Sequence, residues 1–544
     1  MKGAIGIVGA GTMGAGIAQV AAVAGHRVLI ADAVPGAAER AVPGIRDGVS
    51  AQVAKGRLSV DPGALDLAAV DSADGLAECA VVIEAIVEDL AAKRALFAEL
   101  EGVVAADAML ASNTSSLSPT ALAAGLVRPG RLVGLHFFNP VPAMRLVEVI
   151  SGLATDAETA DAAAALAVAW GKTVVRSTAT PGFIVNRIAR PFYGEAWRLY
   201  EEHAAVPENI DAVLTGAGGF RMGPFALMDL IGHDVNEAVT RSVWAAFGHD
   251  PRFAPALAQR SLVEAGWLGR KAGRGIYPAG GAPAPSPLTA APAPDSVTEH
   301  AFSGAERDGA DAAGAGRDGA DRAERAGAVR KQASSPLRPL LDRSGVAIMP
   351  GDRDDGDAGL PDGLVELPSG ALLVVSEGVT ATSLSAAFER PVIVVDRVLD
   401  PAAATAIAVA ASDGCPPAAL AEAAGLLQAA GLDVYAVDDT PGLVVTRTVA
   451  MLANLAADAL ACQVASEPDI DTAMRLGVNY PLGPLAWARQ WGTGTVLRVL
   501  DSLDNWYRDG RYRASPLLRR AALAARAPAG GGLLPRQGQA GSGQ

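Results

Sequence analysis

The sequence predicts a chain of the α/β class that continues into helical domains. We expect a parallel sheet with crossover helices, an all-α domain, a degenerate α/β segment and a second all-α domain. Apolar runs alternate with helical patterns over about the first 175 residues, strand signals end near Thr180, and later motifs repeat at a fixed offset. At 544 residues the chain is also too long for one hydrophobic core.

The N-terminal domain, residues 1–179, consists of short apolar runs separated by stretches rich in Ala, Leu and Glu. Such alternation favours a parallel sheet whose strands are joined by crossover helices. The expected buried strands are Ala4–Val8, Arg27–Ala31, Val81–Ala85, Met109–Ala111 and Leu132–Leu135.

The following domain, residues 180–279, is expected to be helical. Thr180-Pro181-Gly182 is typical of a helix start, with Thr180 as the cap and Pro181 in the first helical position. One amphipathic helix is then expected from Phe183 to Tyr200, and further helices to about Leu262.

The composition changes in residues 280–343, where Pro, Ala, Gly, Ser and mixed charges dominate. The pentapeptide Arg307-Asp308-Gly309-Ala310-Asp311 recurs there as Arg317-Asp318-Gly319-Ala320-Asp321. Little of this segment could enter a core, so we expect a disordered linker. The same expectation holds for residues 528–544.

A repeat at one offset indicates that the helical domain is duplicated. Three motifs recur 260 residues later (441 − 181, 471 − 211, 483 − 223). They are Thr180–Arg187 and Thr440–Arg447, Ile210-Asp211 and Ile470-Asp471, and Gly223-Pro224 and Gly483-Pro484. The second all-α domain is therefore expected at residues 440–527. Residues 344–439 have room only for a truncated α/β remnant.

Composition excludes several classes of function. A net charge of −14 argues against a protein that coats nucleic-acid phosphates. Cys79, Cys415 and Cys462 give neither a disulfide framework nor a metal-binding CxxC spacing, so no metal is expected. With no signal peptide or apolar run of transmembrane length, we expect a cytoplasmic protein that binds no membrane.

A glycine-rich turn follows the first expected strand and opens a helix. Its residues are Gly9, Ala10, Gly11, Thr12, Met13 and Gly14. The glycines permit the tight turn, the approach of a pyrophosphate and helix–strand packing, and the helix N-terminus favours phosphate. Asp32 ends the next strand, where a carboxylate would bind a ribose 2′-hydroxyl and repel a 2′-phosphate. The pattern predicts a Rossmann-like domain that binds NAD rather than NADP.

Two further segments carry polar residues at expected strand ends, where open sheets bind ligands. One is Ser112–Ser116; the other is Gly134–Pro140, with Glu148 twelve residues after His136. Imidazole is suited to take an alcohol proton near neutral pH, and a carboxylate on its second nitrogen would fix its tautomer. On spacing alone, His136 could equally be a core residue and Glu148 a solvated strand residue.

Residues 1 to about 277 resemble the L-3-hydroxyacyl-CoA dehydrogenases. The motifs are GAGTMG, AIVEDLAAK, ASNTSSL, GLHFFNPVP, TPGFIVNR and GRKAGRGIY. The resemblance implies that His136 is the general base and Glu148 its partner, and that Ser115 and Asn186 contact and orient the substrate. It also implies that Glu88, Lys93, Ser115, Asn139 and Lys271 line the nucleotide and that Lys55 meets a coenzyme A phosphate. The family often has serine near Gly48, so one coenzyme A contact differs here.

The arrangement of domains resembles the bacterial phenylacetate-pathway type within that family, which implies (3S)-3-hydroxyadipyl-CoA as the substrate. The alternative substrate is 3-hydroxybutyryl-CoA, and the alternative class is a non-catalytic NAD-binding sensor or structural protein. Arg145, Arg187 and Arg221 are each candidates for a cation that meets a distal carboxylate, or for a solvated face.

Projection by 260 residues indicates that the second copy is inactive. His136 falls on Asp396, Glu148 on Ala408 and Asn186 on Thr446, and no GxGxxG motif precedes this copy. An apolar helical pattern nevertheless persists through Val449–Leu460. The resemblance implies that the helical domain pairs subunits, so we expect the second helical domain to pack on the first within one chain. A homo-oligomer remains open.

Overall fold

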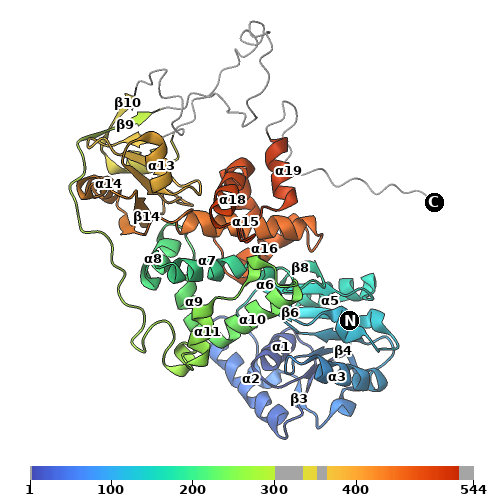
Figure 1. Cartoon of the computed structure of the whole chain (residues 1–544). Coiled ribbons are helices and arrows are strands. Elements are labelled where there is room, and N and C mark those ends of the chain that lie inside the picture. Colours follow the sequence, from blue (N-terminus) through green and yellow to red (C-terminus); the bar gives the residue numbers. More distant parts are fainter. Residues whose placement is uncertain (1–2, 301–334, 352–363, 526–544) are drawn as a thin grey trace, which may run out of the picture. The chain divides into compact units, whose positions relative to one another are not determined.

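The computed structural model describes residues 3–300, 335–351 and 364–525. These residues form two compact units. The larger comprises residues up to 197, 227–280 and those from 448 onward, and the smaller comprises 198–226 and 281–447. Each unit contains one sheet, and Figure 1 labels many of the helices and strands of both.

The sheet of the larger unit has eight strands in the order β3-β2-β1-β4-β5-β6-β7-β8. Neighbouring strands are parallel except for β6 and β7. The expected strands are confirmed, and three more complete the sheet. The bounds are β1 Ala4–Val8, β2 Val28–Ala31, β3 Leu67–Ala69, β4 Cys79–Glu84, β5 Met109–Ser112, β6 Leu132–Phe137, β7 Leu146–Ser151 and β8 Thr173–Thr178.

Helices cover both faces of this sheet. Helices α1 (Thr12–Val23), α2 (Ala37–Ala54) and α5 (Ala157–Ala169) share one apolar core. Helices α3 (Leu90–Val103) and α4 (Pro119–Ala123) share the other. The strand order reverses between β1 and β4, and in such sheets the crevice beyond the strand ends at the reversal binds the ligand.

The first helical domain consists of α6 Val185–Ile188, α7 Arg190–Glu201, α8 Pro207–Gly216, α9 Pro224–Ile231, α10 His233–Ala246 and α11 Leu257–Glu264. The second consists of α15 Val445–Ala461, α16 Glu467–Gly477, α17 Pro484–Trp491, α18 Thr493–Tyr507 and α19 Pro516–Ala524. The first residues of α8, α9 and α10 lie 260 before those of α16, α17 and α18, which confirms the duplication.

The expected start of the first helical domain is wrong. Thr180 does not cap a helix: its hydroxyl makes no hydrogen bond within the described chain, and Phe183 N instead donates to the Thr180 carbonyl. Gly182 and Phe183 both have positive φ, so the segment is a turn and the helix begins only at Val185. The single helix expected from Phe183 to Tyr200 is also wrong, because α6 and α7 are separate.

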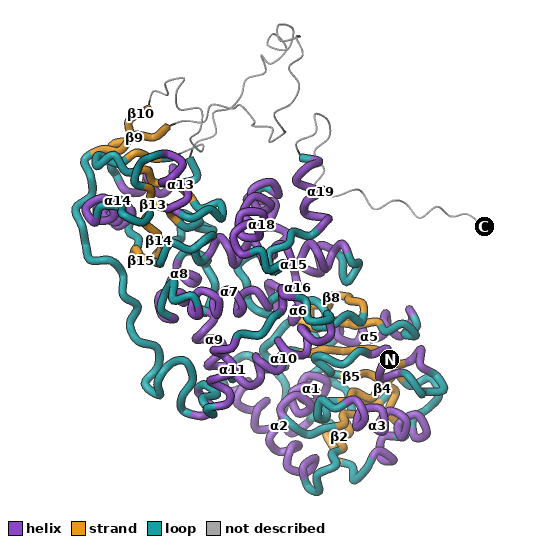
Figure 2. The backbone as a smooth tube through the Cα atoms, viewed as in Figure 1, coloured by secondary structure: helices purple, strands orange, loops and turns teal. Residues whose placement is uncertain are grey.

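The smaller unit contains a seven-stranded sheet in the order β10-β9-β11-β12-β13-β14-β15, and Figure 2 shows the strands of both sheets in orange. The strands are β9 Ser296–His300, β10 Ala347–Gly351, β11 Val365–Glu366, β12 Leu372–Val375, β13 Val392–Val395, β14 Ala406–Ala411 and β15 Asp433–Ala436. The helices are α12 Arg338–Ser344, α13 Ala381–Phe388 and α14 Pro417–Ala429.

The expected linker is wrong at both ends, because β9 and most of α12 lie within residues 280–343. Val297, Leu337, Leu340 and Leu341 enter the apolar core of this unit. Apolar side chains within polar, Pro-rich sequence thus add to the core. Residues 301–334, which include the repeated pentapeptide, and residues 526–544 lie outside the described part of the chain.

The second helical domain packs on the first, as expected. Arg187 Nη2 lies 2.9 Å from Asp458 Oδ2. Arg511 Nε and the Tyr512 hydroxyl donate to the two oxygens of buried Glu195, at 2.9 and 2.8 Å. Leu455 also joins Val243 and Phe253 in a small apolar cluster. These contacts all lie within the larger unit.

Each helical domain also contacts the sheet of the other copy. In the larger unit Thr178 N donates to Val464 O, and in the smaller unit Asp438 N donates to Ala204 O. The two hydrogen bonds are equivalent, since 178 + 260 = 438 and 204 + 260 = 464. A contact in which i meets j and j meets i is the pattern of an isologous interface, here between two halves of one chain.

Candidate active site

The glycine-rich turn has the geometry that a bound pyrophosphate requires. Gly9 has φ +107°, and a Cβ on Gly14 would lie 1.7 Å from the Gly9 carbonyl, so neither position accepts a side chain. A Cβ on Gly11 would meet nothing within 4 Å, and no side chain caps α1 at this residue. The first N–H groups of α1 are therefore available for phosphate.

Asp32 follows β2 and lies beside this turn. Its Oδ2 accepts from Ala10 N at 2.6 Å, and its Oδ1 accepts from Val34 N at 2.8 Å. The carboxylate thus fixes the turn as well as occupying the position expected for a ribose contact. These residues fit a dinucleotide.

His136 and Glu148 are brought together by the one antiparallel pair of this sheet. They lie directly opposite each other on β6 and β7, so their side chains emerge on the same face. His136 Nδ1 lies 2.6 Å from Glu148 Oε2. Glu148 is fully buried and His136 is 4% exposed. They are thus neither a lone core histidine nor a solvated strand carboxylate.

The second oxygen of Glu148 holds the start of the helical domain. Oε1 accepts from the backbone N–H groups of Ile184 and Val185, each at 3.1 Å. The carboxylate therefore links the imidazole to the first turn of α6. Phe138 and Phe183 lie against the imidazole, with ring centroids 4.5 and 5.9 Å from it. With Nδ1 held by Glu148, Nε2 is the nitrogen left for a substrate.

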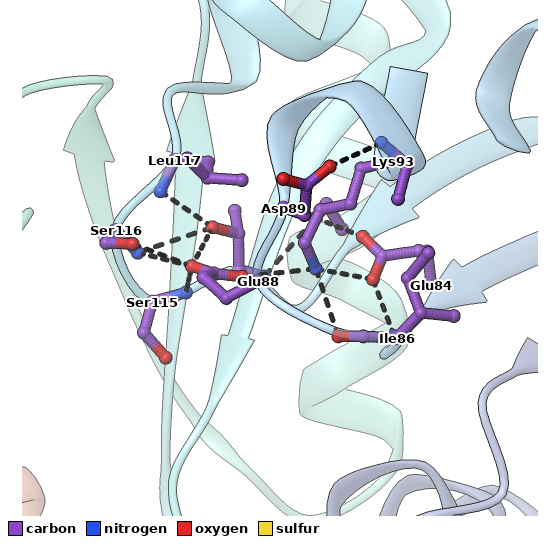
Figure 3. Close-up of polar contacts among 11 residues, drawn as sticks. Glu84, Ile86, Glu88, Asp89, Lys93, Ser115, Ser116 and Leu117 are labelled. Atoms are coloured by element: carbon purple, nitrogen blue, oxygen red, sulfur yellow. Dashed lines mark hydrogen bonds and ion pairs between the residues drawn. The ribbon is translucent and has the colours of Figure 1, made fainter. Parts of the chain in front are cut away.

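The loop after β5 carries Ser115 and is held by a network of charged side chains, of which Glu84 and Lys93 are buried and Glu88 is partly exposed (Figure 3). Glu88 Oε1 accepts from the Thr114 hydroxyl at 2.6 Å and from the backbone N–H groups of Ser115 and Ser116 at 2.9 Å. Burial alone would raise the pKa of Glu88. Hydrogen bonds from Thr114, Ser116 and Lys93, together with the Lys93 charge, outweigh it and lower that pKa.

Lys93 connects this loop to the sheet. Its Nζ lies 2.5 Å from Glu84 Oε1 and 3.2 Å from Glu88 Oε2, and its side chain is 1% exposed. Glu84, at the end of β4, also accepts from the Ser112 hydroxyl. With its ammonium enclosed by two carboxylates, Lys93 positions the serine loop, and a direct contact between Lys93 and the nucleotide stays a prediction.

Asn186 completes the constellation from the helical side. It lies on α6, and its Nδ2 is 3.5 Å from the Ser115 carbonyl. Asn113, just before Ser115, accepts from Phe137 N at 2.8 Å and so joins the serine loop to the strand that carries His136. His136, Glu148, Ser115 and Asn186 therefore converge, although they are up to 71 residues apart in sequence.

Comparison with known proteins identifies the family. Residues 4–180 match the model "3-hydroxyacyl-CoA dehydrogenase, NAD binding domain". Residues 182–279 and 442–532 both match the C-terminal domain of that family. The chain is 42% identical over 523 residues to 3-hydroxyadipyl-CoA dehydrogenase of Escherichia coli K12, covering 95% of this chain and 97% of that protein. This chain belongs to the 3-hydroxyacyl-CoA dehydrogenase family.

Other members of the family match either nearly all of this chain or only half of it. A crystal structure described as 3-hydroxybutyryl-CoA dehydrogenase from E. coli K12 superposes with TM-score 0.81 and 41% identity, covering 96% of this chain and 98% of that one. A probable 3-hydroxybutyryl-CoA dehydrogenase of Bacillus subtilis is 42% identical but covers only 50% of this chain. Residues 373–441 match a "reduced Rossmann-fold domain". The dehydrogenase is thus an NAD-dependent oxidoreductase with an added second half.

The second copy keeps the anchor of the site but not its chemistry. Asp396, at the position of His136, is 1% exposed and accepts from the N–H groups of Val444, Val445 and Thr446 at 2.6–2.9 Å. Val444 and Val445 are the counterparts of Ile184 and Val185, which Glu148 holds in the first copy. Burial raises the pKa of Asp396 despite these hydrogen bonds. Without an imidazole, this copy has no base of the His136 type.

Lys172 is a residue of the site region that sequence reasoning missed. It precedes β8 and is 8% exposed, and its Nζ donates to the carbonyls of Val141 and Met144 at 2.6 and 2.8 Å. These carbonyls belong to the loop between β6 and β7, so Lys172 fixes the loop that follows His136. Burial lowers the pKa of Lys172 to about 8. A lysine between Gly171 and a strand carries no sequence signal for this contact.

The other residues implied by the resemblance lie on the surface. Asn139 is exposed in the loop after β6, and Lys55 is exposed at the end of α2. Lys271 pairs with Asp234 at 2.6 Å. Their contacts with nucleotide or coenzyme A stay predictions. Gly48 lies within α2, and a Cβ there would meet Gln19 at 3.4 Å.

Among the described residues no group of acidic, histidine or cysteine side chains could hold a metal, and no helix is long and apolar enough to span a membrane.

Of the three arginines proposed for a distal carboxylate, Arg187 is excluded. It is 2% exposed, pairs with Asp458, and stacks on Phe247 with its guanidinium carbon 4.8 Å from the ring centroid. It is neither a solvated residue nor a free cation. Arg145 and Arg221 are exposed.

Proposed function

We propose that this dehydrogenase oxidises (3S)-3-hydroxyadipyl-CoA to 3-oxoadipyl-CoA with NAD in bacterial phenylacetate degradation. The observation that carries the chemistry is the His136–Glu148 pair, because binding NAD alone needs no buried base held by a carboxylate. The similarity to the E. coli 3-hydroxyadipyl-CoA dehydrogenase, which extends over 95% of the chain, supports this substrate.

NAD, when bound, supplies the acceptor for the hydride that leaves C3 of the substrate. His136 is the general base, and its Nε2 takes the proton of the 3-hydroxyl as the C3–O bond becomes a carbonyl. Glu148 stabilises the imidazolium through Nδ1, to which its Oε2 lies at 2.6 Å. The alcohol loses one hydride and one proton, so the reaction yields 3-oxoacyl-CoA, NADH and a proton.

The remaining residues bind and orient. Ser115 holds the substrate hydroxyl or thioester from the serine loop, and Asn186 orients the same region from α6. Asp32 selects NAD over NADP, while Glu88, Asn139 and Lys271 line the nucleotide and Lys55 meets a coenzyme A phosphate. Positioning of this kind turns an encounter of two molecules into a reaction within one complex.

A direct assay tests the proposal. The full chain with NAD should form NADH, followed by absorbance, from 3-hydroxyadipyl-CoA and not from free 3-hydroxyadipate. Turnover of the free acid at a comparable kcat/KM would contradict the coenzyme A ester as substrate. Normal NAD binding without turnover of any 3-hydroxyacyl-CoA would point instead to a non-catalytic NAD-binding protein.

The second candidate substrate is 3-hydroxybutyryl-CoA. The crystal structure described as an E. coli 3-hydroxybutyryl-CoA dehydrogenase, similar over 96% of this chain, favours it. A higher kcat/KM for the adipyl ester than for the butyryl ester supports the first candidate, and the reverse order supports the second.

A further inference from the structure

Six arginines are buried among the described residues: Arg131, Arg187, Arg190, Arg252, Arg447 and Arg511. All except Arg190 have a carboxylate partner. The pairs are Arg131 with Glu101, Arg187 with Asp458, Arg252 with Asp250, Arg447 with Glu202 and Arg511 with Glu195. Arg190 is 6% exposed, it forms no ion pair with a carboxylate among the described residues, and the ionisable groups that act on its pKa are the phenols of Tyr193 and Tyr480. A buried charge without a counter-charge destabilises the folded chain, so such a residue indicates a ligand of opposite charge.

The contacts that Arg190 does make are neutral. Its Nε donates to the Asn186 carbonyl at 2.9 Å, and its Nη1 donates to the Thr240 hydroxyl at 3.0 Å. Its guanidinium carbon lies 4.9 Å from the centroid of the Tyr193 ring. Burial raises the pKa of Tyr193 and of the nearby Tyr480, so both phenols stay neutral. These groups hold the guanidinium in place but leave its charge uncompensated.

The location of Arg190 relates this charge to the substrate. Arg190 begins α7, one turn after Asn186, whose amide lies 3.5 Å from the Ser115 carbonyl. In a 3-hydroxyadipyl group the distal carboxylate lies three carbon–carbon bonds beyond the reacting carbon, a reach on the order of one helical turn of about 5.4 Å. A guanidinium one turn from Asn186 is therefore within range of that carboxylate.

The second copy supplies an internal comparison. Its counterpart of Arg190 is Ala450 (190 + 260), and its counterpart of Asn186 is Thr446. The copy without the asparagine is thus also without the cation. Arg190 begins α7, whereas Ala450 lies inside the longer helix α15, so the loss of the arginine accompanies both the loss of the asparagine and a change of helix boundary.

We propose that Arg190 is the specificity-determining residue that binds the distal carboxylate of a dicarboxylic 3-hydroxyacyl-CoA. The inference rests on the proposed function. Charge-assisted guanidinium–carboxylate hydrogen bonds are among the strongest polar contacts in proteins. Sequence reasoning missed Arg190, although the substitution of arginine by alanine between the two copies was a visible signal.

The test compares two substrates of equal chain length, 3-hydroxyadipyl-CoA and 3-hydroxyhexanoyl-CoA, which differ only in a carboxylate or a methyl at the end. The wild-type chain should prefer the adipyl ester. Arg190→Met should lower kcat/KM for the adipyl ester by about 30-fold or more, because a charge pair in a buried site is lost, and should leave that for the hexanoyl ester within about 3-fold.

Two further variants keep the test decisive if Arg190→Met folds poorly. Arg190→Gln keeps a hydrogen-bond donor but no charge and should show the same loss of preference, whereas Arg190→Lys should retain most of it. Arg241→Met, on the neighbouring helix α10 with its side chain 47% exposed, is the matched control and should leave the preference unchanged.

The outcomes separate the two proposals. If charge-removing variants lower turnover of both esters equally, Arg190 holds the fold or a phosphate of coenzyme A and this inference is overturned while the reaction stands. The inference is likewise overturned if Arg145→Met, and not Arg190→Met, removes the preference for the adipyl ester. A wild-type preference for the hexanoyl ester would overturn the adipyl substrate itself, and no turnover of either ester would overturn the proposed reaction.

Discussion

The two oxygens of Glu148 have different partners, and this difference separates its chemical contribution from its structural one. Oε2 faces the His136 imidazole, and Oε1 accepts from the backbone of Ile184 and Val185. In the second copy Asp396 accepts from the equivalent backbone groups, and no imidazole remains. The anchor of the helix is thus retained in both copies, whereas the imidazole is present only in the first.

His136→Gln should lower kcat by roughly 10³-fold or more and leave NAD affinity close to that of the wild type. The variant removes the proposed general base but leaves the glycine-rich turn intact. NADH formation and an NAD titration measure the two quantities. His203→Asn is the matched control, since His203 is exposed with positive φ, a conformation that asparagine tolerates. Near-normal turnover by His136→Gln would refute the assigned mechanism.

Lys172 makes a pH-dependent contribution to stability. Its pKa is about 8 in the folded chain and about 10.4 in an unfolded one. Between these values the unfolded state binds more protons, so the contribution is fully present above about pH 10.4 and is lost as the pH falls through about 8. The free energy of unfolding of the wild type minus that of Lys172→Met should therefore increase from pH 7 to pH 10.

Urea unfolding of both chains at a series of pH values measures this difference, in which the titration of all other groups cancels. Lys55→Met, at an exposed lysine, is the comparison variant. A difference that decreases with pH would show that the two carbonyl contacts of Lys172, and not its desolvation, dominate.

At the scale of elements, strand pairing decides where the site forms. The six strands β3-β2-β1-β4-β5-β6 are parallel to their neighbours, and the antiparallel β6–β7 pair sets His136 directly opposite Glu148. The same pair recurs as β13 and β14, with Asp396 N donating to Ala408 O. The remnant therefore retains the strand pair that carries His136 and Glu148 in the first copy, and Asp396 at the end of β13 orders the first turn of α15.

Asp396→Ala should destabilise the chain without affecting catalysis. Three buried N–H groups at the start of α15 would lose their acceptor, at a cost of about 2–4 kcal/mol. Thermal unfolding should show a lower Tm, while kcat with a 3-hydroxyacyl-CoA, assayed below the transition, should equal that of the wild type. Loss of kcat in the folded variant would mean that the second copy takes part in the reaction.

At the scale of the whole chain, duplication encloses contacts that a half-length chain would expose. Arg187 and Glu195 in the first helical domain are 2% and 0% exposed because Asp458, Arg511 and Tyr512 cover them. A relative such as the B. subtilis protein corresponds to only half of this chain. The second half thus covers a surface that includes both charged and apolar groups.

A chain ending near Ala279 should therefore dimerise or aggregate. The surface of its helical domain would then expose the charged residues Arg187 and Glu195 and the apolar residues Val243 and Phe253, and such surfaces rarely stay unpaired. Light scattering and a melting curve, each recorded also on the full chain, measure the effect. A truncated chain that stays monomeric and as heat-stable as the full chain would refute this role for the second half.

Local sequence determined much of this protein. The glycine-rich turn, the alternating strands and the 260-residue repeat could be predicted because each depends on residues close in sequence or on a motif copied whole, whereas the pairing of His136 with Glu148 was implied by the family resemblance and not by spacing. The ends of elements were harder to predict. Thr180 has the sequence of a cap, but the start of α6 is held instead by Glu148, which lies 36 residues before Ile184. Polar composition likewise concealed β9, whose pairing with β10 and β11 spans a long insertion.

Tertiary structure alone decided which charges are paired. Arg187 and Arg190 lie three residues apart, yet Arg187 pairs with Asp458, 271 residues away, and Arg190 forms no ion pair with a carboxylate in the described chain. Lys93 and Lys172, likewise, proved to hold the serine loop and the loop after His136. The strength of a charge depends on burial and on partners that are distant in sequence, so no local pattern reveals it.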